Sequence, residues 1–258
     1  MGSFEGKRAV VIGASSGFGE MIAERFAAEG ARLLLAARGL ERLEPVAKRL
    51  GAHAVACDIT DYEAVKGLAA SAVAQLGGLD IAINSAGYED LAFFPDLTPE
   101  RVEPMVAVQF TGALYVIQQM AAAMASGGSI VTISSLTATL VAEGYAHYAG
   151  AKAGINHATR IAASEYGARG VRVNVVSPTL IETPMTQHLL KAPGVADAFR
   201  AETPLGRIGR IDDVVGAVTW LAGDESSFVT GQNLHVDGGT SLRRLPRAAD
   251  FVRAAGGS

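Results

Sequence analysis

Short runs of apolar residues alternate with longer amphipathic segments along most of this chain. The run AVVIG at residues 9–13 has no polar position, which is typical of a parallel strand buried on both faces. The segment EMIAERFAAEG at residues 20–30 is amphipathic and ends at a glycine, as many helices do. Further strands are predicted at residues 31–38, 53–60, 79–87, 129–135, 171–178 and 232–239, and further helices at residues 41–51, 61–76, 99–125, 148–168 and 212–221. This alternation predicts an α/β fold with a doubly wound, seven-stranded parallel sheet and helices on both faces.

Two segments interrupt the alternation. Residues 88–99 form an irregular, aromatic loop. Residues 179–205 contain three prolines and are too broken for one helix. Because long segments of this kind in a compact domain are often lids, a lid is predicted at about residues 179–205. We find no linker, repeat or low-complexity block, so residues 1–258 are predicted to form one domain with a basic C-terminal tail at residues 241–258.

Composition and charge narrow the class of protein. The chain has 258 residues, of which 49% are hydrophobic and 19% charged, and this composition indicates an ordered globular protein. A net charge of −4 does not favour nucleic acid or an anionic membrane as a partner. No apolar run approaches the roughly 18 residues of a spanning helix. Cys57 is the one cysteine, which excludes an internal disulfide and a cysteine-based zinc site. We expect a cytoplasmic protein that acts on a small molecule and needs no metal.

A glycine-rich turn follows the first predicted strand. Gly13, Gly17 and Gly19 surround Ser15, Ser16 and Phe18, and a helix comes next. Glycines at such a turn let the backbone approach a pyrophosphate and leave the helix N-terminus facing negative charge. A tight strand-to-helix connection without a ligand is the alternative. The position after the first strand favours nucleotide binding.

The end of the second predicted strand bears on which nucleotide binds. Enzymes that use NAD usually have a carboxylate there for the ribose hydroxyls, but this chain has Ala36, Ala37 and Arg38. An arginine can bind a 2′-phosphate through charge-assisted hydrogen bonds. The alternative is an arginine that only reaches solvent. The sequence therefore favours NADP(H), with Asp58 and Asn84 ending neighbouring strands at the same edge of the sheet.

Tyr148 and Lys152 stand four residues apart in an alanine-rich segment. In a helix, their side chains lie on one face with Cβ atoms roughly 5–6 Å apart. The ammonium favours the phenolate, so the pKa of Tyr148 is predicted to fall below its usual value of about 10. A tyrosine shifted in this way can exchange a proton at neutral pH. The alternative is an exposed pair on a helix surface.

Several short motifs occur together in one order: GASSGFG, CDIT, NSAG, a serine thirteen positions before Tyr148, YAGAK, VRVNVVSP, PLGRIG and GQNLHVDGG. In this combination, from about Lys7 to Gly239, the chain resembles the short-chain dehydrogenase/reductase family in its compact single-domain form. The resemblance implies a Rossmann-like fold and hydride transfer between a nicotinamide cofactor and a carbonyl carbon.

The resemblance also implies roles for individual residues. Ser135 is expected to hydrogen-bond the substrate carbonyl oxygen, and Tyr148 to donate or accept the proton. Lys152 is expected to hold the nicotinamide ribose and to lower the pKa of Tyr148. Thr183 resembles the residue that hydrogen-bonds the nicotinamide amide. The full set expected at the cofactor is Gly13, Ser15, Ser16, Gly17, Phe18, Gly19, Arg38, Asp58, Ile59, Asn84, Ala86, Gly87, Tyr148, Lys152, Pro178, Ile181 and Thr183.

Three positions depart from the family pattern. Ile12 stands where a threonine is usual, so Asn84 is expected to rely on backbone or water partners. Thr179 stands where a glycine is usual and lacks its freedom at positive φ. Gln109 aligns with a catalytic asparagine that supports a water chain to the active-site lysine, and its extra methylene is expected to shift or break that relay. Restoring the asparagine, Gln109→Asn, is expected to raise, or at least not lower, the rate.

The expected function is NADP(H)-dependent interconversion of a ketone and a secondary alcohol. Aromatic and leucine residues on the flanking loops favour an apolar or aromatic substrate: Tyr88, Leu91, Phe93, Phe94, Tyr145, Leu180, Leu189 and Leu190. Two alternatives stay open, namely 3-oxoacyl thioester reduction and a cofactor-binding sensor or scaffold without turnover. Apolar surface on the helices at residues 101–125 and 148–168 indicates a homo-oligomer, a dimer or a tetramer.

Overall fold

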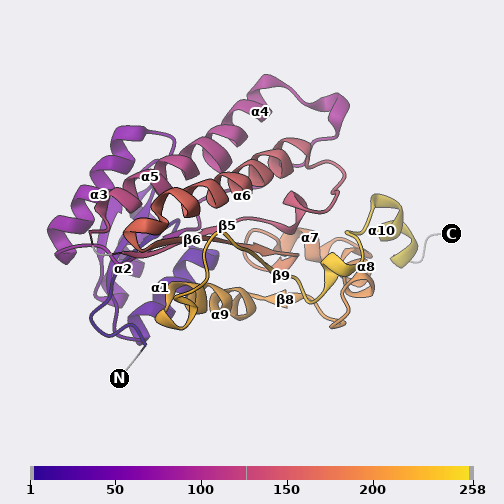
Figure 1. Cartoon of the computed structure of the whole chain (residues 1–258). Coiled ribbons are helices and arrows are strands. Elements are labelled where there is room, and N and C mark those ends of the chain that lie inside the picture. Colours follow the sequence, from indigo (N-terminus) through magenta and orange to yellow (C-terminus); the bar gives the residue numbers. More distant parts are fainter. Residues whose placement is uncertain (1–2, 126, 256–258) are drawn as a thin grey trace.

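The computed structural model describes residues 3–125 and 127–255. A seven-stranded sheet lies between two layers of helices (Figure 1). The strands follow the order β3-β2-β1-β4-β5-β6-β9, and each neighbouring pair is parallel. They are β1 (Arg8–Ile12), β2 (Arg32–Ala37), β3 (His53–Ala56), β4 (Ile81–Asn84), β5 (Gly128–Ile133), β6 (Val171–Pro178) and β9 (Asn233–Val236). The predicted fold class and strand number are confirmed.

Helices cover both faces of the sheet. Helices α1 (Gly17–Ala28), α2 (Leu40–Leu50) and α9 (Ile211–Ala222) cover one face, and α3 (Tyr62–Leu76), α5 (Ala113–Ala123) and α6 (Ala146–Tyr166) cover the other (Figure 1). Neighbouring residues of one strand therefore enter different cores. Val11 belongs to the same buried cluster as Phe26 of α1, whereas Val10 belongs to the cluster that contains Leu68 of α3 and Val116 of α5. This two-sided burial explains why the strands are apolar without alternation.

The predicted helix at residues 99–125 has a more complex structure. It consists of α4 (Pro99–Val106), a π-helical segment (Ala107–Gly112) and α5. By length and composition alone, Pro99–Ala123 could cross a membrane, because an 18-residue window within it has a mean hydropathy of 1.2; the expectation that no run approaches that length is therefore wrong. Within the protein, however, α5 packs on α3, α6 and the sheet, as a core helix does.

The predicted lid segment is broken, as expected, into β7 (Ile181–Glu182), α7 (Gln187–Lys191) and α8 (Val195–Glu202). Strand β7 pairs with β8 (Gly209–Arg210) outside the main sheet. The tail contains a helix that the sequence did not predict, α10 (Ala248–Ala254), which packs on α8. The rings of Phe199 and Phe251 stack there with centroids 6.2 Å apart. Residues 256–258 of the predicted tail lie outside the described residues.

Candidate active site

The glycine turn lies between β1 and α1, against the end of β4. Gly13 has a φ of +80°, and a Cβ atom at this position would lie 2.7 Å from the backbone nitrogen of Ala86. Gly17 has a φ of +58° and begins α1, and a Cβ there would meet no atom within 4 Å. The first glycine is thus required by close backbone packing, whereas the second leaves open space at the start of a helix.

A cleft of about 560 Å³ opens beside this turn. It brings together most of the residues predicted at the cofactor: Gly13, Ser15, Ser16, Gly17, Phe18, Arg38, Asp58, Ile59, Ala86, Gly87 and Thr183. Further lining residues, which the sequence analysis did not name as cofactor contacts, include Arg42, Cys57 and Met185. Six predicted residues do not line it directly: Gly19, Asn84, Tyr148, Lys152, Pro178 and Ile181.

The cleft suits a nicotinamide dinucleotide. Its floor is the N-terminus of the twelve-residue helix α1, where backbone N–H groups favour negatively charged phosphate. The cap residue Ser16 makes no side-chain capping hydrogen bond in the described structure, so its hydroxyl is free for a ligand. Arg38, Arg42 and Asp58 line the same cleft. Residues of the turn would hold the pyrophosphate, and the charged residues would lie near the adenosine.

The prediction that Asp58 and Asn84 end neighbouring strands is wrong, because β2 and β1 lie between β3 and β4 and Asp58 lies beyond the end of β3. The backbone N–H and hydroxyl of Thr60 both donate to Asp58, at 2.9 and 2.8 Å, and these bonds, with the nearby charge of Arg38, lower the pKa of the Asp58 carboxyl. The backbone N–H of Ala86 donates to the Asn84 side chain at 3.2 Å. The expectation that Asn84 uses a backbone partner is therefore confirmed, while Ile12 simply packs in the core.

The structure brings Ser135, Tyr148 and Lys152 together where β5 ends and α6 begins. Ser135 follows β5, and its Oγ accepts hydrogen bonds from the backbone N–H and the hydroxyl of Thr137, at 3.3 and 3.0 Å. The Lys152 Nζ donates to the carbonyl of Ile133 at 2.8 Å and lies 5.9 Å from the centre of the Tyr148 ring. Two consecutive turns of one helix thus direct a phenol and an ammonium toward the end of one strand.

The prediction that Lys152 lowers the pKa of Tyr148 is wrong for this structure. Burial raises the pKa of Tyr148 to about 12, and a hydrogen bond from Ser135 only partly offsets this effect. Burial also lowers the pKa of Lys152 to about 7, because the side chain is only 5% exposed. The helical spacing is as predicted, but desolvation of both groups outweighs their mutual attraction.

Gln109 lies in the π-helical segment and is buried at 2% exposure. Its Nε2 donates to the carbonyl oxygen of Tyr88 at 2.6 Å, whereas its Oε1 has no hydrogen-bond partner among the described residues. Gly87 passes so close that a Cβ there would lie 2.9 Å from both amide atoms of Gln109. The side chain therefore fastens the loop after β4. Thr179, the third departure from the family pattern, does not adopt a positive φ, so the glycine is not required.

A polar cluster lies beside Tyr148 that the sequence analysis missed. The Tyr145 hydroxyl donates to Glu89 Oε2 at 3.4 Å, and the Tyr145 and Tyr148 rings meet edge to face with centroids 6.0 Å apart. His188, on α7 of the predicted lid, places Nε2 3.9 Å from Glu89 Oε1. One sequence feature could have indicated this cluster: the acid Glu89 directly follows Tyr88 in the loop after β4, at the carboxyl end of the sheet.

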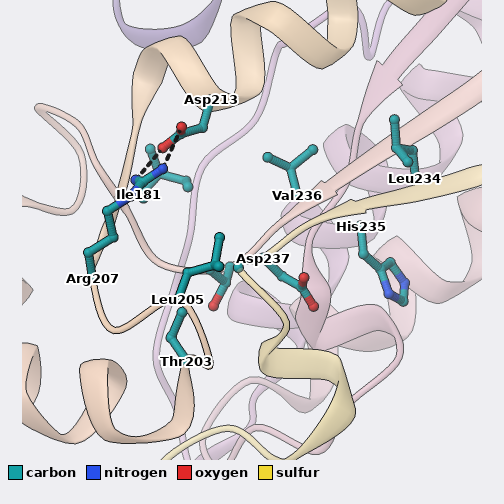
Figure 2. Close-up of a pocket in the computed structure, with 12 residues that line it drawn as sticks. Ile181, Thr203, Leu205, Arg207, Asp213, Leu234, His235, Val236 and Asp237 are labelled. Atoms are coloured by element: carbon teal, nitrogen blue, oxygen red, sulfur yellow. Dashed lines mark hydrogen bonds and ion pairs between the residues drawn. The ribbon is translucent and has the colours of Figure 1, made fainter.

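A second hollow of about 310 Å³ lies beside β9 (Figure 2). Ile181, Leu205 and Val236 surround it, and the Arg207–Asp213 ion pair lies at its rim. Ile181 is 2% exposed and belongs to the core on the α1 side of the sheet. The expectation that Ile181 lines the cofactor cleft does not match this placement, because the chain turns at β7 and directs the side chain under β8.

Comparisons with known proteins identify the class. Residues 13–241 match the family model described as Enoyl-(Acyl carrier protein) reductase. The chain is 34% identical to D-threitol dehydrogenase of Mycolicibacterium smegmatis, over 93% of this chain and 94% of the relative. It is also 34% identical to the 3-oxoacyl-(acyl-carrier-protein) reductase of Escherichia coli, over 92% and 98% of the two chains. A short-chain type dehydrogenase/reductase from Mycobacterium ulcerans superposes with a TM-score of 0.92, at 30% identity over 94% of this chain and 92% of that one.

These matches extend over nearly the whole chain and agree with the site geometry. The protein is an oxidoreductase with a nicotinamide cofactor. It belongs to the short-chain dehydrogenase/reductase family, whose members act on alcohol and carbonyl substrates.

Proposed function

We propose that this protein interconverts a ketone and a secondary alcohol with NADP(H), using Tyr148 as the acid and base. The observation that carries the proposal is the convergence of Ser135, Tyr148 and Lys152 at the carboxyl end of β5, the same edge of the parallel sheet at which the glycine turn follows β1. The bound cofactor supplies or accepts the hydride. Ser135 orients the carbonyl oxygen, Tyr148 transfers the proton to or from it, and Lys152 holds the ribose beside them.

Tyr148→Phe tests this assignment because it removes only the phenolic hydroxyl. General acid–base catalysis contributes roughly 10²- to 10⁴-fold, so the rate of NADPH oxidation with a panel of ketones is expected to fall by at least about 10²-fold. Tyr166→Phe, near the end of the same helix, is the matched control. Equal rates in wild type and Tyr148→Phe would refute the role of Tyr148.

The proposed preference for NADP(H) rests on charge at the rim of the cleft. Arg38 is exposed there, and Arg42 lines the same wall one helical turn further along. Two guanidinium groups favour a 2′-phosphate, although Glu41 and Asp58 also line this wall. Arg38→Ala is expected to lower kcat/KM for NADPH roughly tenfold or more, the contribution of one charge-assisted hydrogen bond, and to leave NADH use nearly unchanged. An equal loss with both cofactors would contradict the preference.

The substrate body is proposed to be apolar or aromatic. Leu91 is half exposed on the loop after β4, and Leu180, Leu189 and Leu190 lie on the predicted lid. Phe93 and Phe94 support this less directly, because they line a separate hollow of about 530 Å³ with residues 137–144. Reduction of a 3-oxoacyl thioester is the second candidate, favoured by the name of the Escherichia coli relative. A thioester and a plain ketone of equal chain length, compared by kcat/KM, distinguish the two.

We also propose that the protein is a homo-oligomer. Phe94 and Val141 are 77% and 89% exposed around the apolar hollow beside α6, and Ile161 is exposed further along the helix. Exposed apolar surface of this kind is typical of interfaces. Light scattering at micromolar concentration is expected to give a dimer or tetramer, and a monomeric mass would contradict the proposal.

A further inference from the structure

Glu89 is a half-buried acid close to Tyr148, and the proposed catalysis does not use it. Its side chain is 22% exposed, and burial raises the pKa of the carboxyl. Its negative charge in turn raises the pKa of Tyr148, which is an influence that requires proximity. A carboxylate that is partly removed from water beside a catalytic group costs free energy unless something binds to it.

The loop holds Glu89 in place from both sides. The carbonyl of Tyr88 accepts the hydrogen bond from Gln109 at 2.6 Å. The carboxylate of Asp90 pairs with Arg101 at 2.9 Å and with the buried ring of His147 at 3.2 Å. Because both neighbours are tied to helices α4 to α6, the Glu89 side chain is directed toward Tyr145 and not into bulk solvent.

The partners of Glu89 leave most of its hydrogen-bonding capacity unused. A carboxylate offers about four lone-pair sites, but Tyr145 donates to only one of them, over a long 3.4 Å. His188 is 3.9 Å away, beyond hydrogen-bond distance, on an exposed side chain of the lid segment. The carboxylate can thus accept a further hydrogen bond beside the phenol and the imidazole.

We propose that Glu89, Tyr145 and His188 form a recognition site for a second hydroxyl group of the substrate, close to the reacting carbon. The preferred substrates are then hydroxyketones and the corresponding diols. This inference rests on the proposed carbonyl reduction and names its substrate class. The three side chains offer both an acceptor and donors, which matches a hydroxyl group, since a hydroxyl donates one hydrogen bond and accepts others. An ammonium group could only donate, so it would match the carboxylate but not the donors of the site.

The test compares matched ketones that differ only in the second hydroxyl, such as acetophenone and 2-hydroxyacetophenone, with 2-aminoacetophenone as a third member. NADPH oxidation gives kcat/KM for wild type, Glu89→Gln and Tyr145→Phe. A hydrogen bond to a charged group contributes roughly 10- to 100-fold, so Glu89→Gln is expected to lower the hydroxyketone-to-ketone ratio of kcat/KM by about that factor. Tyr145→Phe removes one donor and is expected to lower the ratio about two- to tenfold. Glu143→Gln, on an exposed loop nearby, is the matched control and is expected to keep the wild-type ratio.

Each outcome decides between specific statements. If Glu89→Gln and wild type have the same ratio, the recognition site is refuted and the proposed function stands. If Glu89→Gln loses a preference for the aminoketone and not for the hydroxyketone, the site binds an ammonium group and its assignment to a hydroxyl group is wrong. If wild type oxidises NADPH with none of the ketones and reduces NADP⁺ with none of the alcohols, the proposed function is refuted and this site with it. A ratio is insensitive to a simple loss of folded protein, because both ketones are measured on one preparation.

Discussion

Lys152 gives the protein a pH-dependent stability that one substitution should remove. Its pKa is lowered to about 7 in the folded chain, from 10.5 when exposed, because burial disfavours the ammonium. Between these two values the unfolded chain binds more protons than the folded chain, so the stability of the folded chain rises with pH. The slope is at most about 1.4 kcal/mol per pH unit, and it starts as pH passes through 7. Between pH 7 and pH 9 the gain is about 2 kcal/mol, or a rise in Tm of roughly 4–8 °C for a domain of this size.

Lys152→Met isolates this effect because it keeps the length of the side chain and removes the titrating group. Urea unfolding of the cofactor-free protein, at constant protein concentration and several pH values, gives the free energy of unfolding of wild type and variant. Their difference is expected to change by about 2 kcal/mol between pH 7 and pH 9, in favour of wild type at the higher pH. Other titrating groups, such as Cys57 with its pKa raised to about 11, are common to both proteins and cancel.

Lys66→Met, at an exposed position on α3, is the matched control and is expected to show a much smaller pH-dependent difference. Parallel pH profiles of wild type and Lys152→Met would refute the reasoning. That result would mean that Lys152 stays protonated in the folded chain at pH 9 and that burial costs it little.

Three further predictions concern the supports of the site. The asparagine of Gln109→Asn is too short to keep the hydrogen bond to the carbonyl of Tyr88, so this variant is expected to lower the free energy of unfolding by about 1–2 kcal/mol in urea titrations. Its reductase rate is still expected not to fall, and a large loss of rate would mean that the site is built around Gln109. Gly13→Ala places a Cβ at positive φ against Ala86 and is expected to weaken cofactor binding at least tenfold by calorimetry, whereas an unchanged Kd would contradict the close packing. Phe251→Ala removes the stacking partner of Phe199 and is expected to speed proteolysis within α7 and α8 severalfold; the exposed Val252→Ala is its control, and equal cleavage of both variants would contradict support of the predicted lid by α10.

The strands could be predicted from the sequence because both faces of the sheet are covered. Every position of a run such as residues 9–13 must then be apolar, and this pattern needs no knowledge of partners. The positions at which strands end are harder to predict from the sequence. Residues 53–60 were predicted as one strand, but β3 ends at Ala56 because Asp58 turns the chain by accepting the N–H of Thr60. Such an Asx turn depends on a hydrogen bond to the aspartate side chain, so the pattern of apolar residues alone does not predict it.

The π-helical segment could not be predicted for a different reason. Its buried residue Gln109 bonds to Tyr88, 21 positions earlier, and Gly112 presses on the backbone of Ile59. These contacts exist only after α4 has packed on α6 and α5 on the sheet. Local sequence favours an uninterrupted helix here, and the tertiary contacts override it. Glu89 was missed for the same reason, because its significance depends on Tyr145 and His188, which come from two distant segments.

The prediction for the pKa of Tyr148 is wrong because it leaves out the burial of Lys152. The spacing of the pair correctly places both side chains on one helix face, and the attraction between an ammonium and a phenolate is real. That attraction lowers the pKa of Tyr148 only while Lys152 carries its proton, and burial has lowered the pKa of Lys152 to about 7. Lys152 also donates its Nζ hydrogen bond to the carbonyl of Ile133. Any ligand that stabilises the charged lysine in this site would therefore also promote ionisation of Tyr148, so the two pKa values are expected to move together on binding.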